Sequence, residues 1–342
     1  MKRRSEQADI LDVAREAGVS PATVSRALNH PEIVRPDTRE RIRAAVDKLG
    51  YIRNRAASSM HGARSGAVGL IVPTIDNAIF SKLIQAFSTT LQNEGVTLLI
   101  ATHGYDQETE RQRLRKLLEH RVDGVGLIGL SHHAGSFELL EARETPAVLM
   151  WSYADDAPLP CVGSDNFEAG RLAAEHLLSL GHRRIATIFP PTVGNDRAER
   201  RLAGAVSALQ AARAAPDKAW RRSSRYSLRQ AREAAETLLA DERRPTAILA
   251  GNDILARGAL AAAAALGIKV PEALSVIGIG DFSGSADAIP ALTTVKIDAT
   301  RVGEAAARVL LTRMSSADES EDRLEIPLEL MARETCRPPA IV

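Results

Sequence analysis

The residues near the start of the chain that are best suited to a chemical task lie on one face of a short predicted helix. Helical spacing places Ala22, Ser25, Arg26 and Asn29 together, at i, i+3, i+4 and i+7. This face is small, neutral or basic, and it carries no carboxylate. Such a face can enter the major groove of DNA, where an arginine donates hydrogen bonds to guanine. The alternative is the solvated surface of a small helical bundle.

Elsewhere the chain has no pattern typical of a catalytic or metal site. Its carboxylates are scattered, no Gly-x-Ser-x-Gly motif occurs, and His132 and His133 have no further ligand at helical spacing. Cys161 and Cys336 lack the spacing of metal ligands, so we expect two separate buried thiols. We therefore predict neither an enzyme nor a metal or other cofactor.

Charge is unevenly distributed along the chain, whose formal net charge is only +1. Residues 1–65 contain 13 Lys and Arg against 8 Asp and Glu, whereas the remainder is slightly acidic. This indicates a polyanionic partner for the first segment alone. No apolar run reaches the ~18 residues of a membrane span, and no apolar signal core follows the basic start. We expect a cytoplasmic protein that does not enter membranes.

Three helices must position the basic face. The second of them begins at Pro21 after the N-cap Ser20 and runs to about Leu28. The third extends from Pro36 to Leu49 and ends before a glycine. Residues 54–61 could form barely two further turns, so we expect that segment to become helical only on contact with a partner. The expected core consists of Val13, Ala14, Ala17, Val24, Ala27, Leu28, Ile42, Val46 and Leu49.

From Gly66 onward, apolar strand patterns alternate with amphipathic helix patterns. Alternation at this density predicts parallel sheets joined by right-handed crossovers, an α/β fold. Some 275 residues exceed one doubly wound unit, so we expect two similar lobes with a ligand cleft at the carboxyl ends of their strands. Strands are predicted over 67–72, 96–101, 124–128, 147–151, 185–189, 246–250 and 275–279, and helices over 80–93, 108–120, 167–180, 199–212, 227–240 and 254–266.

The stretches DVAREAGVSPATVSRALN and TRERI…LGYIRNRAA resemble the head of the lactose-repressor (LacI) family of bacterial transcription regulators. The resemblance implies an all-α helix-turn-helix domain at 8–53, a hinge helix and linker at 54–66, and an effector-binding and dimerisation domain at 67–342. It also implies a periplasmic-binding-protein-like body. Its first lobe would comprise about 67–163 and 294–323, and its second about 164–293 and 324–342, with PALTTVKID near a crossover.

The same resemblance implies contacts with double-stranded operator DNA. Arg26 would be the main hydrogen-bonding reader, because Pro21 and Ala22 offer only apolar contacts, for example to a thymine methyl. Met60 aligns with the hinge leucine that the family wedges into the minor groove. Arg35 replaces the usual serine before the third helix, so a helix cap is lost. The implied DNA contacts are Ser20, Pro21, Ala22, Thr23, Ser25, Arg26, Asn29, Thr38, Tyr51, Asn54, Ala57 and Met60.

For the body, the resemblance implies an effector site between the lobes. Phe80 aligns with an aromatic residue that stacks on the ligand, and Arg201 aligns with the family's effector arginine. Asp165 and Asp253 could equally cap the helices that follow them. The implied contacts are Phe80, Ser164, Asp165, Asn195, Arg197, Arg201, Asn252, Asp253 and Asp281, with Asn195 and Arg197 on a loop.

The nature of the effector follows from the same positions. Gly280 replaces an aspartate that many members carry, whereas Arg197 and Arg201 remain and could each pair with a carboxylate. THGYDQETERQRLRKLLEHRVDG and VGSDNFEAG also resemble the gluconate-repressor branch more than the lactose or purine branches. We therefore expect a sugar acid such as gluconate, although arginines of the family also bind hydroxyls of neutral sugars. Tyr226 could stack on the ligand or pack within the fold.

These features predict a sequence-specific DNA-binding regulator, a repressor of a bacterial carbohydrate-utilisation operon located at the nucleoid. One short recognition helix reads few base pairs, so we expect a homodimer, or a tetramer, on a pseudo-palindrome. Whether the effector releases or recruits DNA stays open. The alternative is the solute-binding protein of a sugar transporter, which would need an export signal and no helix-turn-helix. An enzyme on the same framework ranks third.

Overall fold

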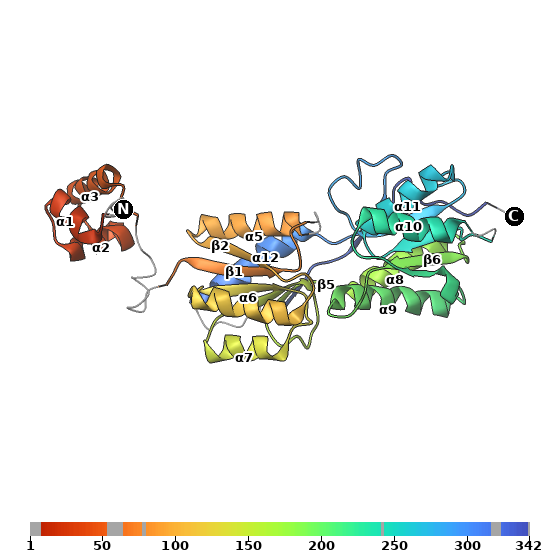
Figure 1. Cartoon of the computed structure of the whole chain (residues 1–342), viewed down its shortest axis with the longest axis horizontal. Helices are drawn as coiled ribbons and strands as arrows, with labels where there is room; N and C mark the ends of the chain where they lie inside the picture. Colours follow the sequence, from red (N-terminus) through yellow and green to blue (C-terminus); the bar gives the residue numbers. More distant parts are fainter. Residues whose placement is uncertain (1–7, 53–63, 77–79, 241–242, 316–322, 341–342) are drawn as a thin grey trace, which may run out of the picture. The chain divides into compact units, whose positions relative to one another are not determined.

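The computed structural model describes residues 8–52, 64–76, 80–240, 243–315 and 323–340 (Figure 1). The chain divides into two units, Met1–Ser65 and Gly66–Val342. We call them the head and the body. The expected hinge, residues 54–61, lies outside the described residues.

The head is built from α1 (Ile10–Ala17), α2 (Pro21–Asn29), the short 3-10 helix η1 (Pro31–Ile33) and α3 (Pro36–Leu49). The Asp9 carboxylate accepts a hydrogen bond from the backbone N–H of Asp12 (2.9 Å), and the Asp12 carboxylate accepts one from Asp9 N–H (3.1 Å), which caps α1. Ser20 caps α2 as predicted, and Arg35 makes no side-chain cap on α3. The predicted core residues pack together, with Leu28, Val46 and Leu49 at its partly buried margin.

The first lobe of the body is a parallel sheet of strand order β11-β5-β4-β3-β1-β2. Helices α5 and α12 cover one face, and α6 and α7 cover the other (Figure 1). The strands are β1 (Ala67–Val72), β2 (Thr97–Thr102), β3 (Gly124–Ile128), β4 (Ala147–Ser152), β5 (Cys161–Ser164) and β11 (Arg323–Glu325). The helices are α5 (Ser81–Asn93), α6 (Gln107–Glu119), α7 (Ala134–Ala142) and α12 (Ala299–Ser315).

The second lobe repeats this design with strand order β12-β10-β9-β8-β6-β7, where only the β10–β12 pair is antiparallel within the described residues. Helices α8 and α9 pack together, as do α10 and α11. The strands are β6 (Ile185–Phe189), β7 (Arg221–Ser223), β8 (Ala247–Ala250), β9 (Ser275–Gly280), β10 (Thr293–Lys296) and β12 (Glu329–Met331). The helices are α8 (Asn166–Ser179), α9 (Asp196–Ala211), η3 (Lys218–Trp220), α10 (Leu228–Leu239) and α11 (Asp253–Ala265).

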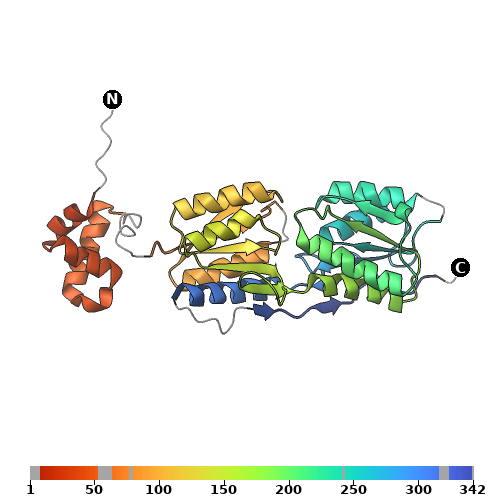
Figure 2. The ribbon, with the colours of Figure 1, turned by 90° about the horizontal axis from the view of Figure 1, so that it is seen from below.

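The chain passes between the lobes after β5, after β10 and after β11. Figure 2 shows the last two strands, β11 and β12, following one another.

The structure corrects two expectations. Residues 294–296 belong to the second sheet, so the return to the first lobe follows Lys296 rather than starting at about 294. Helix α9 begins at Asp196, three residues before the predicted start, because Asn195 caps it by accepting a hydrogen bond from Ala198 N–H (3.4 Å).

Candidate functional site

The exposed face of α2 is the first candidate site. Arg26, Ala22 and Asn29 are exposed, and Ser25 is half-buried beside them. The Asn29 amide donates a hydrogen bond to the backbone oxygen of Ser25 (2.8 Å), which holds it along the helix. The face is therefore as expected: one free-standing guanidinium among short neutral side chains, presented by a helix whose other side packs into the head's core.

The other implied DNA contacts have diverse surroundings. The hydroxyl groups of Ser20 and Thr23 form a hydrogen bond (2.8 Å) at the start of α2. Thr38 lies half-buried in the first turn of α3, and Tyr51 packs against the core of the head. Pro21 is exposed at the first turn of α2. Asn54, Ala57 and Met60 lie outside the described residues.

Several implied effector residues use their polar atoms within the fold. Ser164 is buried and donates its hydroxyl to the backbone oxygen of Ile326 (2.8 Å). Asp165 caps α8 by accepting hydrogen bonds from Phe167 N–H (2.8 Å) and Glu168 N–H (3.4 Å). Asp165 also pairs with Arg200. These contacts support the capping role for Asp165.

Asp253 does not cap α11. That role belongs to Asn252, which accepts a hydrogen bond from Leu255 N–H (3.0 Å). Asp253 is fully buried and accepts hydrogen bonds from Phe282 N–H (2.8 Å), the Ser285 hydroxyl (2.7 Å) and the Thr294 hydroxyl (2.6 Å). Burial raises the pKa of this carboxyl group. Its oxygens therefore join the ends of several elements of the second lobe.

Two further candidates are also engaged by the protein. Phe80 is buried, and its ring meets that of Trp151 edge-on, with the ring centroids 5.1 Å apart. Asp281 forms an ion pair with Arg333 (2.8 Å). The Nδ2 atom of Asn252, by contrast, is buried and has no hydrogen-bond partner among the residues that the structure describes.

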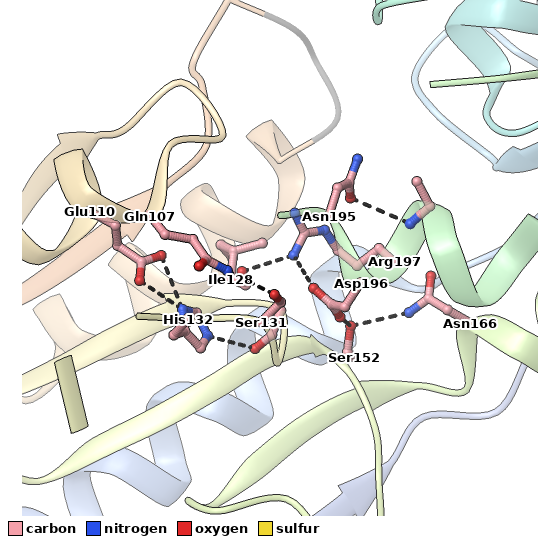
Figure 3. Close-up of polar contacts among 12 residues, drawn as sticks. Gln107, Glu110, Ile128, Ser131, His132, Ser152, Asn166, Asn195, Asp196 and Arg197 are labelled. Atoms are coloured by element: carbon pink, nitrogen blue, oxygen red, sulfur yellow. Dashed lines mark hydrogen bonds and ion pairs between the residues drawn. The ribbon is translucent and has the colours of Figure 1, made fainter. Parts of the chain in front are cut away.

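A buried polar network joins the lobes at the start of α9 (Figure 3). Arg197 donates to the backbone oxygen of Ile128 in the first lobe (2.9 Å) and pairs with Asp196 (3.0 Å). Ser152, at the end of β4, donates its hydroxyl to the other carboxylate oxygen of Asp196 (2.8 Å). The Asn166 amide, on α8, donates to the Ser152 hydroxyl (3.3 Å). We call Ser152, Asn166, Asp196 and Arg197 the interlobe network.

Arg197 was expected on a loop, and the structure places it in the first turn of α9 instead. Its charge is compensated by Asp196 and its Nη1 atom is bound to the first lobe. Gly129 permits this approach, since a Cβ at that position would lie 1.9 Å from Nη1 of Arg197. The role of Arg197 within the fold is therefore to hold the lobes together.

Arg201, one helical turn later, is 3% exposed. Its Nε donates to the backbone oxygen of Arg197 (3.0 Å), and its Nη2 lies 3.4 Å from the hydroxyl of Tyr226, which also accepts from the Asn195 amide (3.2 Å). Among the described residues no carboxylate lies within ion-pair distance of it. Burial lowers the pKa of Arg201. A buried guanidinium without a counter-ion is energetically costly, which points to a ligand that supplies one.

Aromatic rings from both lobes surround Arg201. Tyr105, in the β2–α6 connection, lies with its ring 5.7 Å from that of Tyr226. Burial raises the pKa of Tyr105, so this phenol stays neutral. Tyr226 therefore contacts both Arg201 and the opposite lobe.

Helix packing fixes the position of Arg201. Helices α8 and α9 meet at two glycines: a Cβ at Gly170 would lie 1.8 Å from the backbone oxygen of Arg201, and one at Gly204 would lie 1.9 Å from that of Phe167. The helix backbones are thus in direct contact. Any larger residue at these positions must displace the helix that carries the arginine.

Sequence reasoning missed Ser152, Asn166, Asp196 and Tyr105. Asn166 and Tyr105 lie within stretches that carry the resemblance, but no spacing rule singles out any of the four, and they come together only in the folded body. No group of three or more His, Cys, Asp or Glu side chains is arranged to hold a metal ion in the part of the chain that the structure describes. In the same part, none of the helices is long and apolar enough to cross a bilayer.

Known protein families match both the head and the body of this chain. The model of bacterial regulatory proteins of the lacI family matches residues 9–54, and the periplasmic binding protein-like domain matches residues 174–336. The HTH-type transcriptional repressor PurR of Haemophilus influenzae is 30% identical over 333 residues, 96% of this chain and 99% of the relative. The HTH-type transcriptional regulator GntR of Pseudomonas aeruginosa is 33% identical over 325 residues, 95% of this chain and 94% of the relative.

Solved structures give the same result. The transcription regulator GntR from Chromobacterium violaceum superposes with a TM-score of 0.74 at 33% identity, covering 79% of this chain and 98% of that one. The lac repressor dimer bound to operator and the anti-inducer ONPF superposes with a TM-score of 0.83 at 28% identity, covering 96% and 99%.

A helix-turn-helix head on a body of two parallel-sheet lobes defines a DNA-binding transcriptional regulator. With relatives of this identity along nearly its whole length, the chain belongs to the LacI family of bacterial regulatory proteins. Its relatives are transcriptional regulators and repressors rather than enzymes.

Proposed function

We propose that this repressor controls a bacterial carbohydrate-utilisation operon and that a sugar acid such as gluconate, bound between the lobes, sets its affinity for operator DNA. It would act in the cytoplasm as a homodimer or a tetramer. Relatives named GntR support the choice of effector. A structure described as a transcriptional regulator CelR–cellobiose complex, similar at a TM-score of 0.70 and 28% identity, supports carbohydrate recognition by this kind of body.

The observation that carries the effector proposal is the environment of Arg201. Asp196 already neutralises Arg197, and Asp281 already pairs with Arg333. Arg201, by contrast, has no carboxylate at ion-pair distance among the described residues, and Gly280 supplies none. One carboxylate would balance it with two parallel hydrogen bonds, so the site suits a monoanion. The unpaired donor of Asn252 would suit a hydroxyl of the same ligand.

On DNA, we propose that Arg26 donates to guanine while Pro21 and Ala22 make apolar contacts with neighbouring bases. Ser20, Thr23, Ser25, Asn29, Thr38 and Tyr51 would contact phosphates or support those contacts, and Asn54, Ala57 and Met60 would act at the minor groove. Two heads would read two half-sites of a pseudo-palindrome, because one helix reads too few base pairs for specificity.

The test of the effector proposal uses gluconate and its uncharged polyol, glucitol. Calorimetry should detect gluconate binding to the wild type and much weaker binding of glucitol. Arg201→Gln should lose at least about tenfold in gluconate affinity, since a charge-assisted pair contributes ~1.5–3 kcal/mol. Arg229→Gln is the matched control, because Arg229 is a highly exposed residue of α10 paired only with Glu233 among the described residues.

A gel-shift experiment with genomic fragments connects the two sites. Arg201→Gln should bind its operator as the wild type does, yet its affinity should no longer change when gluconate is added. If the variant responds at the wild-type concentration, Arg201 is structural and the effector proposal is wrong. Equal binding of glucitol and gluconate would indicate a neutral-sugar effector instead.

A further inference from the structure

A second buried charged group lies beside the interlobe network, in the first lobe. Glu110 of α6 is 2% exposed at its side chain, and His132, in the β3–α7 connection, is fully buried. Nδ1 of His132 lies 2.9 and 3.0 Å from the two carboxylate oxygens of Glu110. Nε2 of the same ring lies 3.0 Å from the backbone oxygen of Gly129. Both residues therefore meet without solvent (Figure 3).

Hydrogen-bond chemistry fixes how many protons this pair holds. A backbone oxygen only accepts, so Nε2 of His132 must carry a hydrogen. Nδ1 faces a carboxyl group, and that contact also needs a hydrogen, on the ring or on the acid. The pair thus holds one proton more than a neutral imidazole beside a carboxylate would. It is either an imidazolium with a carboxylate or a neutral ring with a carboxylic acid.

The surrounding groups do not supply that proton. His103 approaches Glu110 (3.7 Å), but its Nδ1 lies 3.3 Å from the backbone oxygen of Asp106 and burial lowers its pKa, so a bare Nε2 faces the acid. Glu108, on the same helix, pairs with Arg111 and approaches His133. From α9 the charged groups are Arg197 and Asp196, which pair with each other. Phe137 packs edge-on against the His132 ring, with the centroids 5.8 Å apart.

The pair holds the part of the first lobe against which the second lobe rests. His132 anchors the backbone oxygen of Gly129, and the preceding oxygen, that of Ile128, receives the hydrogen bond from Arg197. Gln107 anchors the same loop through the hydroxyl of Ser131 (2.9 Å). Gly129 has a left-handed backbone (φ +98°) and no room for a side chain beside Arg197. A shift of this loop would move the acceptor of Arg197 and, through Arg197, the helix turn that carries Arg201.

We propose that Glu110 and His132 are positioning residues of the effector site: they hold one buried proton between them, and removing it loosens the loop that Arg197 binds. The proposal rests on the proposed function for its effector and on the interlobe network for its mechanism. The native arrangement needs this proton, because without it Nδ1 of His132 and the Glu110 carboxylate would face each other with no hydrogen between them.

Glu110→Gln is the decisive variant, because an amide can donate to a bare Nδ1 while the neutral ring still donates to Gly129. It keeps one hydrogen bond to Nδ1 and the one to Gly129, and it needs no extra proton. Glu108→Gln removes the same charge two residues away on an exposed part of α6 and serves as the control. Both variants should bind gluconate like the wild type. Glu110→Ala, which leaves Nδ1 of His132 without its partner, should bind gluconate about tenfold more weakly.

Two measurements without effector separate this proposal from the identity of the ligand. Nitrogen NMR of the His132 ring should show Nε2 protonated, and amide exchange of residues 129–131 should be about tenfold faster in Glu110→Ala than in the wild type or Glu110→Gln. His132→Phe should raise that exchange as well. A bare Nε2, or the same exchange in Glu110→Ala and Glu110→Gln, would overturn the proposal. Absence of gluconate binding with these two results intact would instead refute the proposed effector alone.

Discussion

Arg26 and Arg201 carry the same guanidinium group in opposite surroundings. Arg26 is exposed on a helix of the head, where water compensates its charge until DNA replaces the water. Arg201 is buried, and the protein offers it only a backbone oxygen and a phenol. The first side chain can therefore discriminate among bases, and the second can discriminate among small ligands by charge.

Substitution of Arg26 should separate base reading from phosphate binding. Arg26→Ala should cost ~1–3 kcal/mol of operator affinity at one symmetric base position. Arg26→Lys retains the charge but loses the planar two-hydrogen-bond geometry, so specificity at that position should weaken while the salt dependence changes little. Binding to a library of operator variants measures both. Uniform weakening across the library would make Arg26 a phosphate contact.

At the scale of elements, the contact between α8 and α9 determines where Arg201, the arginine proposed to bind the effector, lies. Helices that touch through backbone atoms cannot slide or rotate without a clash. The two glycines therefore fix the position of the helix that carries Arg201. The same contact leaves the first turn of α9 directed toward the first lobe, where Asp196 and Arg197 meet their partners.

Gly170→Ala should therefore affect both stability and ligand binding. The added methyl group meets the backbone oxygen of Arg201, and overpacking of this kind costs ~1–3 kcal/mol. Thermal unfolding should show a lowered midpoint for the body, and gluconate affinity should fall as α9 is displaced. Gly204→Ala, which meets α8 from the other side, should behave alike. An unchanged midpoint in both variants would contradict the close packing of the two helices.

Most elements with a periodic pattern could be predicted from the sequence. The alternation of apolar strands and amphipathic helices predicted both lobes, although α12, with 17 residues, was not among the expected helices. Strands β11 and β12 have three residues each, too few for a pattern to be recognised. The true start of α9 was hidden by a polar first turn, which is why Arg197 was expected on a loop.

The candidate site could be proposed from the sequence only where a single residue lies in a recognisable motif. Arg201 was proposed in this way, from its place in a family motif, and its role stays a prediction. Glu110 and His132 are separated by 22 positions in the chain, so no spacing rule connects them. His132 had been set aside because it lacked a ligand at helical spacing, and its actual partner comes from a neighbouring helix.

At the scale of the whole molecule, the head and the body have separate cores. A ligand in the body can change DNA binding only if it has different affinities for two arrangements of the lobes. The interlobe network, with the loop that Glu110 and His132 are proposed to hold, lies where such arrangements would differ. Dimerisation would then convert a change in the body into a change in the spacing of two heads.

The proposed dimer predicts a strong dependence on operator symmetry. A duplex with both half-sites should bind at least about 100-fold more tightly than one with a single half-site, since the second contact is then intramolecular. Fluorescence anisotropy on the two duplexes, with sedimentation of the free protein, measures this difference. A monomer in sedimentation, or equal affinity for both duplexes, would contradict the dimer.

The order of strands in the sheets has a consequence for protein synthesis. The edges of the two sheets are closed by β11 and β12, which follow all other strands in the chain. As the nascent chain leaves the ribosome, the head can fold early, but neither lobe is complete until these last residues emerge. A ribosome that stops after α12 releases an intact DNA-binding head on a body with unpaired strand edges at β5 and β10, which are sites of aggregation. A nonsense codon in this stretch therefore yields an aggregating DNA-binding protein rather than a shortened regulator.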